Sequence, residues 1–200
     1  CAQGTDICII NADGAAQVNI TADQPSQDSY PDWTLDGRIV FMSDRDSAGG
    51  RQSEIYIMAA DGSAAERLTL NGIHYNAYPA VSPDGTRIAF ESDQDVAIGS
   101  ELYVMQLDGS GVQRITTDDV WNQNPAWSPD GMRLLFAASD SFGNMDLYEV
   151  PADASAAPAR LTSHEYEDGG LRLGHSYLPV PLQRTSRVNE AERLRVRPVA

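Results

Sequence analysis

Residues 78–90 read Tyr-Pro-Ala-Val-Ser-Pro-Asp-Gly-Thr-Arg-Ile-Ala-Phe, and residues 102–109 read Leu-Tyr-Val-Met-Gln-Leu-Asp-Gly. The apolar tetrad and turn of the second stretch occur in four copies, which begin at Ile7, Ile55, Leu102 and Leu147 and are therefore 48, 47 and 45 residues apart. A repeat period of about 20–50 residues is typical of solenoids, propellers and arrays. The period therefore limits the architecture before any single residue is interpreted.

Each unit contains four short apolar runs that are separated by turn signals. In turns such as Ser82-Pro83-Asp84-Gly85, proline presets φ and glycine can adopt a positive φ. The runs are too short for helices and are rich in β-branched and aromatic residues, so they predict four antiparallel strands per unit. The middle two strands are apolar at successive positions, which indicates that both of their faces are covered. Four-stranded sheets packed face to face around an axis form a β-propeller.

The blades predicted in this way are a half blade at residues 4–21 and complete blades at 27–70, 75–117 and 122–163. We expect them to be part of a larger propeller. In the alternative, the tail of the chain closes a four-bladed ring, with Tyr177 to Val180 beside residues 4–21. Aromatic side chains are expected to be buried between the blades at Trp33, Phe41, Tyr56, Phe90, Tyr103, Trp127 and Phe136.

Several phrases resemble the TolB-type propeller repeat over residues 4–163, among them Arg67-Leu68-Thr69, Arg87-Ile88-Ala89-Phe90 and the stretch Pro125 to Gly131. The resemblance implies a non-enzymatic binding module that lies in the periplasm or outside the cell. Similar blades occur in prolyl oligopeptidase-like peptidases and in oligogalacturonate lyase. The chain as the propeller half of such an enzyme, or as a structural repeat without a ligand, therefore remains an alternative.

Signals of catalysis are weak in this sequence. It contains neither a Gly-x-Ser-x-Gly elbow nor a His-Glu-x-x-His motif. His74 and His164 occupy different positions in their units, so we interpret them as isolated loop histidines. The arginine that recurs in each fourth strand is expected to protect an exposed sheet edge from pairing, at Arg67, Arg114 and Arg160.

Antiparallel strands place the loops between second and third strands at the same end of a blade as the loops between units. These loops are long, unlike one another and acidic, and Glu54, Glu101 and Asp146 are expected to be among their carboxylates. Variable loops on a rigid scaffold are where binding concentrates. The candidate partner-binding residues are Asp44, Asp93, Tyr75, Tyr78 and Trp121. Weak candidates for Ca²⁺ ligands are Asp44, Asp46, Asp93 and Asp95, and the alternative is that these loops only promote solubility.

The net charge of −15 disfavours a nucleic acid and favours a protein partner with a basic patch. Residues 164–200 differ in character, since the stretch 171–200 has six arginines against two glutamates, and we expect a divergent, partly disordered tail. The sequence contains no apolar run of about 18 residues, which is the length that would predict a membrane span. Cys1 is either a lipid-anchor site or a trimmed start, and Cys8 is expected to be a buried core residue.

Overall fold

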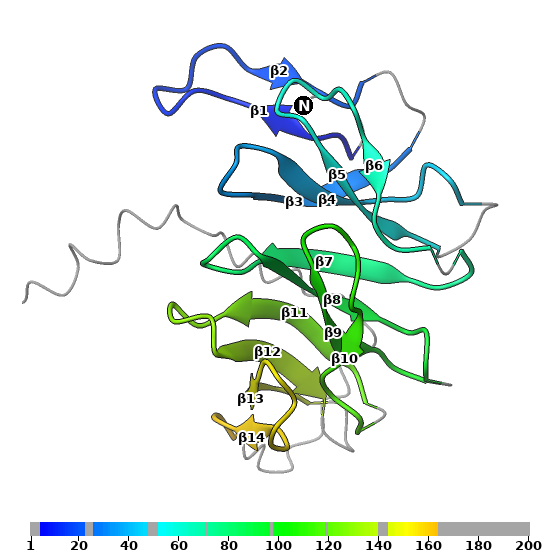
Figure 1. Ribbon diagram of the computed structural model, residues 1–200, viewed down its shortest axis with the longest axis vertical. Helices are drawn as coiled ribbons and strands as arrows, with labels where there is room; N and C mark the ends of the chain where they lie inside the picture. The colour runs from blue at the N-terminus through cyan, green and yellow to red at the C-terminus, as the bar shows by residue number, and fades with distance from the viewer. Residues whose placement is uncertain are drawn as a thin grey trace, which may run out of the picture. The chain divides into compact units, whose positions relative to one another are not determined.

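The computed structural model of the chain describes residues 5–22, 26–47, 52–70, 72–96, 98–118, 120–139 and 144–163, which all lie in the unit Cys1–His164. Every regular element in these ranges is a β-strand (Figure 1). The same ranges contain no helix with the length and hydropathy needed to cross a membrane. Cys1, His164 and the tail with Tyr177 to Val180 lie outside the described residues, and so do the expectations placed on them.

The strands form three four-stranded sheets and one two-stranded sheet, all antiparallel, which confirms the predicted fold class. Blade 1 contains β3 (Asp28–Trp33), β4 (Ile39–Ser43), β5 (Glu54–Met58) and β6 (Glu66–Arg67). Blade 2 contains β7 (Asn76–Val81), β8 (Arg87–Ser92), β9 (Glu101–Gln106) and β10 (Gln113–Arg114). Blade 3 contains β11 (Asn122–Trp127), β12 (Arg133–Ser139), β13 (Met145–Pro151) and β14 (Ala159–Arg160). The half blade contains only β1 (Cys8–Ile9) and β2 (Val18–Asn19).

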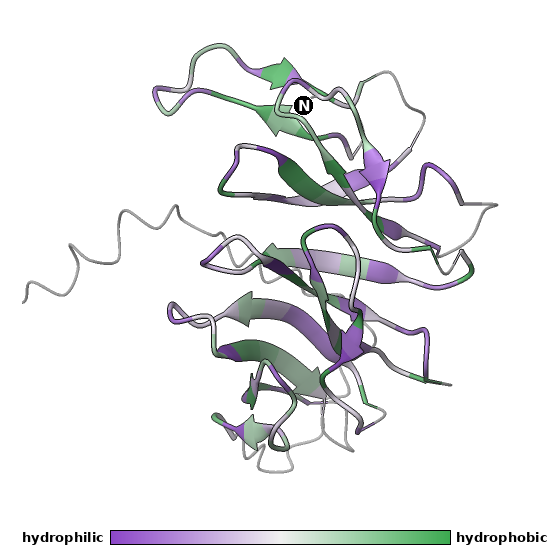
Figure 2. Cartoon of the chain, in the orientation of Figure 1, coloured by the Kyte–Doolittle hydropathy of each residue, from purple (hydrophilic) through white to green (hydrophobic). Residues whose placement is uncertain are grey.

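The hydrophobic core lies between the sheets. One cluster joins blades 1 and 2 through residues such as Ile57 and Phe90, and another joins blades 2 and 3 through residues such as Val104 and Phe136. Figure 2 shows hydrophobic colours on the middle strands and hydrophilic colours on β6 and β10. The predicted burial is confirmed for Phe41, Tyr56, Phe90, Tyr103 and Phe136, all at most 3% exposed.

The Asp-Gly turns that end the third strands also allow the blades to approach each other closely. Gly109, in the turn after β9, has a φ of +82°, which glycine adopts without a steric penalty. A Cβ atom on Gly109 would lie only 2.9 Å from the carbonyl oxygen of Leu68 in blade 1. The glycine is therefore required both by the turn and by the contact between blades.

The first strands of successive blades contact one another and form the inner side of the stack. The Val81 amide of β7 donates a hydrogen bond of 2.8 Å to the Asp32 carboxylate of β3. The Trp127 indole of β11 donates one of 2.9 Å to the Ala80 carbonyl oxygen of β7. The guanidinium of Arg87, the first residue of β8, lies 4.6 Å from the Trp127 ring centroid.

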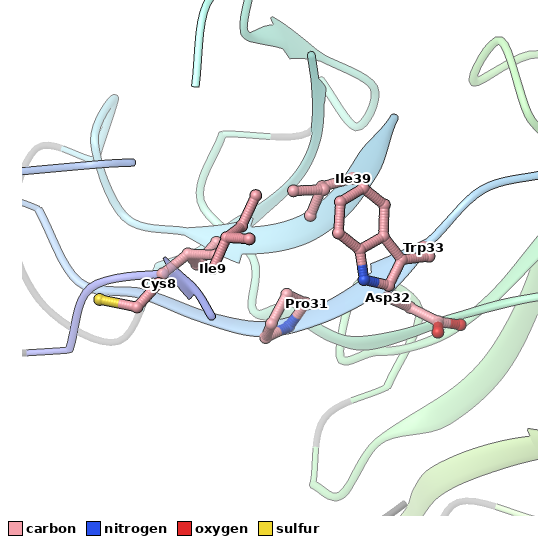
Figure 3. A pocket seen from close by; sticks show the side chains of 7 residues that line it. Cys8, Ile9, Pro31, Asp32, Trp33 and Ile39 are labelled. Carbon is pink, nitrogen blue, oxygen red and sulfur yellow. The ribbon is translucent and has the colours of Figure 1, made fainter. Parts of the chain in front are cut away.

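Trp33 occupies the same repeat position as Trp127, but the expectation that it is buried is wrong. Its exposed fraction is 53%, and it lines a hollow of about 70 Å³. Figure 3 shows Trp33 together with Ile9, Pro31 and Ile39, which also line this hollow. Among the described residues the half blade has only its outer two strands, and none of them covers Trp33 as an inner strand would. Ile10 is exposed for the same reason, at 53%, whereas its equivalents Met58 and Met105 are at most 1% exposed.

Cys8 corrects a second expectation. It takes the repeat position of Tyr56 and Tyr103, yet it is only partly buried, and it is disulfide-bonded rather than a free core thiol. The equivalent tyrosines each pack against the phenylalanine of their second strand, with ring centroids 5.7 Å apart for Phe90 and Tyr103. The described half blade has no second strand and hence no such ring partner for Cys8.

The two equivalent tryptophans allow a matched test of blade packing. Trp127→Ala removes an indole hydrogen bond and a ring that packs on the core, so it should lower the free energy of unfolding by about 2–4 kcal/mol. Trp33→Ala should change it by less than about 1 kcal/mol, because most of that ring is already in water. Urea unfolding of both variants measures the difference, and equal losses would show that Trp33 is covered in solution.

Candidate binding face

The loops at one end of the blades are tied to one another by backbone pairing, and we call this end the loop face. It comprises the loops between second and third strands and the loops between successive blades. Ser53 pairs with Tyr75 in an isolated parallel bridge, and Ser100 pairs with Trp121 in the same way. The Asn76 amide donates to the Ser53 carbonyl oxygen at 3.0 Å, and the Asn122 amide donates to that of Ser100 at 2.9 Å. The same backbone pairing therefore connects blade 1 to blade 2 and blade 2 to blade 3 at the loop face.

The candidate residues Asp44 and Asp93 occupy equivalent positions just after the second strand. The Asp44 carboxylate accepts a hydrogen bond of 2.7 Å from the Gln27 amide, and the Asp93 carboxylate accepts one of 2.9 Å from the Tyr75 amide. His74 Nδ1 also lies 3.1 Å from Asp93. Each aspartate thus extends the pairing of its first two strands, and the Asp93 side chain remains 42% exposed and accessible to a partner.

The candidates Asp46 and Asp95 are partners of buried tyrosines. The Tyr56 hydroxyl donates to Asp46 at 2.6 Å, and the Tyr103 hydroxyl donates to Asp95 at 2.8 Å. Burial and these hydrogen bonds raise the pKa of both tyrosines. Within the described ranges, no group of three or more His, Cys, Asp or Glu side chains could hold a metal ion, so the four aspartates proposed for Ca²⁺ do not form a cluster.

The aromatic candidates belong to two sets of equivalent positions. Tyr75 and Trp121 each precede the first strand of a blade, where Trp121 is 42% exposed and Tyr75 is half-buried. Tyr78 lies inside β7 and packs on Tyr30 of β3, with ring centroids 4.1 Å apart and hydroxyl oxygens 3.3 Å apart. Burial and the hydrogen bond to Tyr30 raise the pKa of Tyr78. The loop face and the adjoining inner strands thus present all three side chains.

A β-bulge sets the direction of Tyr78. The register of each first strand shifts at one point, and the residue there has a positive φ: Tyr30 at +54°, Tyr78 at +52° and Asn124 at +55°. A positive φ is uncommon for a bulky residue, and bulges of this kind turn a side chain in a new direction. The proline that follows in each blade was visible in the sequence, but the bulge before it was not predicted.

Glu54, Glu101 and Asp146 are not exposed loop carboxylates, which corrects the sequence interpretation. They are buried at or near the start of the third strands, with exposed fractions of at most 6%. Each forms an ion pair with the arginine of its fourth strand, at 2.8 Å for Glu101 and Arg114. The threonine two residues after each arginine joins the group, and Thr116 Oγ1 accepts a hydrogen bond of 2.9 Å from the Leu102 amide.

The recurring arginines therefore have another role than the expected protection of an edge. Arg67, Arg114 and Arg160 neutralise a buried carboxylate in their own blade. The sequence held a signal for this pairing, because an acidic residue stands just before the apolar tetrad in every unit that has the arginine. In the half blade the arginine is replaced by Asn19, whose side-chain amide donates to Asp6 at 2.7 Å.

Glu91 is a further functional candidate that the sequence analysis missed. It lies in β8, is 1% exposed, and accepts a hydrogen bond of 3.4 Å from the Asn124 amide of blade 3. Burial raises the pKa of Glu91 to about 8, the Asn124 amide opposes this shift, and the charge of Asp93 adds to it. The burial of Glu91 was not predictable from the sequence, because a neighbouring blade causes it.

The opposite end of the blades consists of short turns whose polar groups are already engaged. The Ser82 hydroxyl donates to the Asp84 carboxylate at 2.6 Å, and the Thr86 amide donates to it at 3.0 Å. These hydrogen bonds lower the pKa of Asp84 to about 2. The aspartates of this end thus stabilise their own turns.

Comparisons with known proteins agree with this geometry. The family model of the TolB beta propeller domain matches residues 74–170, which confirms the TolB-like resemblance. A protein of Agrobacterium tumefaciens assigned as a TolB is similar in structure, with a TM-score of 0.64 and 23% identity, over 78% of this chain and 56% of that one. No curated protein matches the sequence.

Propellers of enzymes are similar as well. An oligogalacturonate lyase in complex with manganese has a TM-score of 0.60 and 14% identity, over 80% of this chain and 44% of that one. A Mycobacterium tuberculosis puromycin-hydrolyzing peptidase has a TM-score of 0.61 and 16% identity, over 82% of this chain and 28% of that one. The chain thus spans between about a quarter and somewhat over half of these structures, and at these identities the likeness shows the fold.

The buried ion pairs should dominate the electrostatic part of stability. Arg114→Ala leaves the fully buried Glu101 carboxylate without its cation and should lower the free energy of unfolding by about 3 kcal/mol. Arg133→Ala breaks an exposed pair with Glu149 and should cost less than about 1 kcal/mol. Chemical denaturation at neutral pH compares the two, and similar costs would contradict a structural role for the buried pair.

The raised pKa of Glu91 predicts that its replacement stabilises the protein at high pH. Between about pH 4.5 and pH 8 the unfolded chain releases this proton while the folded chain keeps it, so the free energy of unfolding falls as pH rises. Glu91→Gln removes this loss and should be more stable than the wild type by about 2–4 kcal/mol at pH 8, with a smaller difference at pH 5. Thermal unfolding across this range tests it, and a difference independent of pH would refute the assignment.

Proposed function

We propose that this chain is a non-enzymatic β-propeller module that binds a protein partner with a basic patch at its loop face. The observation that carries the proposal is the contrast between the two ends of the blades. The loop face presents Asp44, Asp93, Tyr75 and Trp121, and the adjoining strand β7 adds Tyr78, whereas the described turns of the opposite end contain no aromatic side chain. Aromatic anchors with complementary charge are typical of protein interfaces.

Charge supports a basic partner. The chain carries a formal net charge of −15, and Asp93 keeps a partly exposed carboxylate at the rim of the loop face. A field of this sign accelerates encounter with a basic surface and repels phosphate groups. The on-rate of the complex should therefore fall as the salt concentration rises.

We place this module in the periplasm or outside the cell. The resemblance to TolB supports this setting, and so does Cys8, which is disulfide-bonded. Disulfides persist in oxidising compartments and are rare in the cytosol.

A second candidate function is the propeller part of a larger enzyme. It is supported by the similarity to an oligogalacturonate lyase and to a peptidase, of which this chain spans 44% and 28%. A full-length reading frame that adds a hydrolase domain with a serine elbow would favour the peptidase.

Paired substitutions separate the two ends of the blades. Tyr75→Ala with Trp121→Ala removes two equivalent aromatic side chains from the loop face. The affinity for a partner found by pull-down should fall at least tenfold, because aromatic anchors dominate interfaces. Thr86→Ala with Ser110→Ala changes only exposed turn residues of the opposite end and should leave affinity within about twofold. Surface plasmon resonance measures both, and a loss confined to the second pair would place binding at the opposite end.

A further inference from the structure

Glu91 differs from every other buried carboxylate in the described part of the chain. Five carboxylates there are buried, and four of them pair with an arginine: Asp28 with Arg45, Glu54 with Arg67, Glu101 with Arg114, and Asp146 with Arg160. Glu91 has a long hydrogen bond from the Asn124 amide and no cationic partner among the described residues. It is the buried acid that this part of the chain leaves without a counter-charge.

The fold does not need an acid at this position. Phe41, Phe90 and Phe136 are equivalent, so the residues that follow them are equivalent too: Met42 in blade 1, Glu91 in blade 2 and Ala137 in blade 3. In the other two blades a methionine or an alanine is therefore sufficient for the packing at this position. Burying a carboxyl group without a partner is costly, so an acid that packing does not require points to a ligand.

The surroundings of Glu91 come from three inner strands. Glu91 is the register partner of Ala77, so the bulge of β7 that holds Tyr78 begins one residue away, and the charge of Glu91 contributes to the environment of Tyr78. Tyr30 of β3 packs on Tyr78, and Asn124 of β11 reaches Glu91 from the other side. Asn124, whose amide donates to Glu91, is exposed, and so is Tyr30, which packs on Tyr78.

The chain already contains an arginine held by this combination of groups. The Arg45 guanidinium lies 4.9 Å from the Phe41 ring centroid and 5.0 Å from that of Tyr56. The same guanidinium donates a hydrogen bond of 3.0 Å to the buried Asp28 carboxylate. Two aromatic rings and a buried acid thus form a seat for a planar cation, since a guanidinium stacks on rings while it binds a carboxylate.

We propose that Glu91, together with Tyr30 and Tyr78, receives an arginine side chain of the partner protein. This inference rests on the proposed binding function. In it, the partner inserts an arginine guanidinium beside the inner strands. A planar guanidinium suits these groups better than Ca²⁺ does, because Ca²⁺ takes 6–8 oxygen ligands, whereas here a single carboxyl group lies near Tyr78, whose ring packs on that of Tyr30. The partner is therefore an arginine-bearing segment that reaches past the loops.

The test uses a short synthetic peptide, acetyl-Gly-Arg-Gly-amide, and the same peptide with neutral citrulline in place of arginine. Binding to the full chain is followed by chemical-shift changes of the tyrosine rings. The arginine peptide should bind and shift the rings, and the citrulline peptide should bind at least tenfold more weakly. Equal binding of the two peptides would overturn the proposal, and so would the absence of binding by either.

Variants then locate the seat. Glu91→Gln keeps the shape but cannot ionise when the guanidinium binds, so it should weaken binding of the arginine peptide at least tenfold. Glu91→Met, which copies Met42 of blade 1, should have the same effect. Asp61→Asn is the matched control, because it removes one exposed charge in a turn of the opposite end and should leave binding within twofold. If Glu91→Gln and Asp61→Asn lose similar affinity for the arginine peptide, net charge alone explains the loss, and Glu91 is not the residue that binds the arginine.

The same variants distinguish this inference from the wider proposal. If Tyr75→Ala with Trp121→Ala weakens the protein partner while Glu91→Gln does not, the loop face binds and the arginine seat is wrong. If Glu91→Gln weakens both the peptide and the partner while the aromatic pair has no effect, the seat is correct and binding lies at the inner strands rather than on the loops.

Discussion

The buried carboxylate at the start of each third strand is the interaction on which the blade stack depends. In blade 1, Glu54 binds Arg67 and Thr69 of its own blade and also accepts a hydrogen bond of 3.0 Å from the Asn76 side chain of blade 2. In blade 2, Glu101 binds Arg114 and accepts one of 3.1 Å from Asn122 of blade 3. One acid thus joins two strands of its blade to the first strand of the next. The arginine compensates for its burial, so neither residue can be removed alone without leaving a buried group unpaired.

This joint fixes the first strand of each blade at its start and leaves the rest of that strand available for function. Asn76 and Asn122 begin β7 and β11, and two residues later each strand reaches its bulge at Tyr78 or Asn124. A bulky residue with positive φ persists only where the surrounding structure holds it. The joint on one side and the packed second strand on the other hold these bulges. The inner strands can therefore turn side chains such as Tyr30 and Tyr78 out of the sheet without loss of the blade.

The repeat predicted the blades because turns and strands are local properties. The Asp-Gly and Ser-Pro-Asp-Gly turns and the doubly apolar second and third strands were sufficient to predict the sheets, their order and the burial of Phe90 and Tyr103. The contacts of a residue with a neighbouring blade could not be predicted in this way, because they depend on residues that are distant in sequence. Trp33 and Trp127 share one motif, but in the described part of the chain a four-stranded blade packs against Trp127 and only two strands precede Trp33. Glu54 and Glu101 were assigned to loops because a residue at a strand boundary is buried only by contacts distant in sequence.

The candidate site shows the same division. Asp93, Tyr75 and Tyr78 were selected as candidates because long acidic loops with aromatic residues can be recognised in the sequence, and the structure brings Asp93 and Tyr75 into direct contact. Glu91 was not found, because in sequence it is one polar residue in a strand. Only the comparison of three blades shows that its equivalents are apolar, and only the ion-pair pattern shows that buried acids of this fold have an arginine. An exception to a structural rule that a repeat protein otherwise keeps in every blade is therefore stronger evidence for function than the recurring residues, which in this chain serve the scaffold.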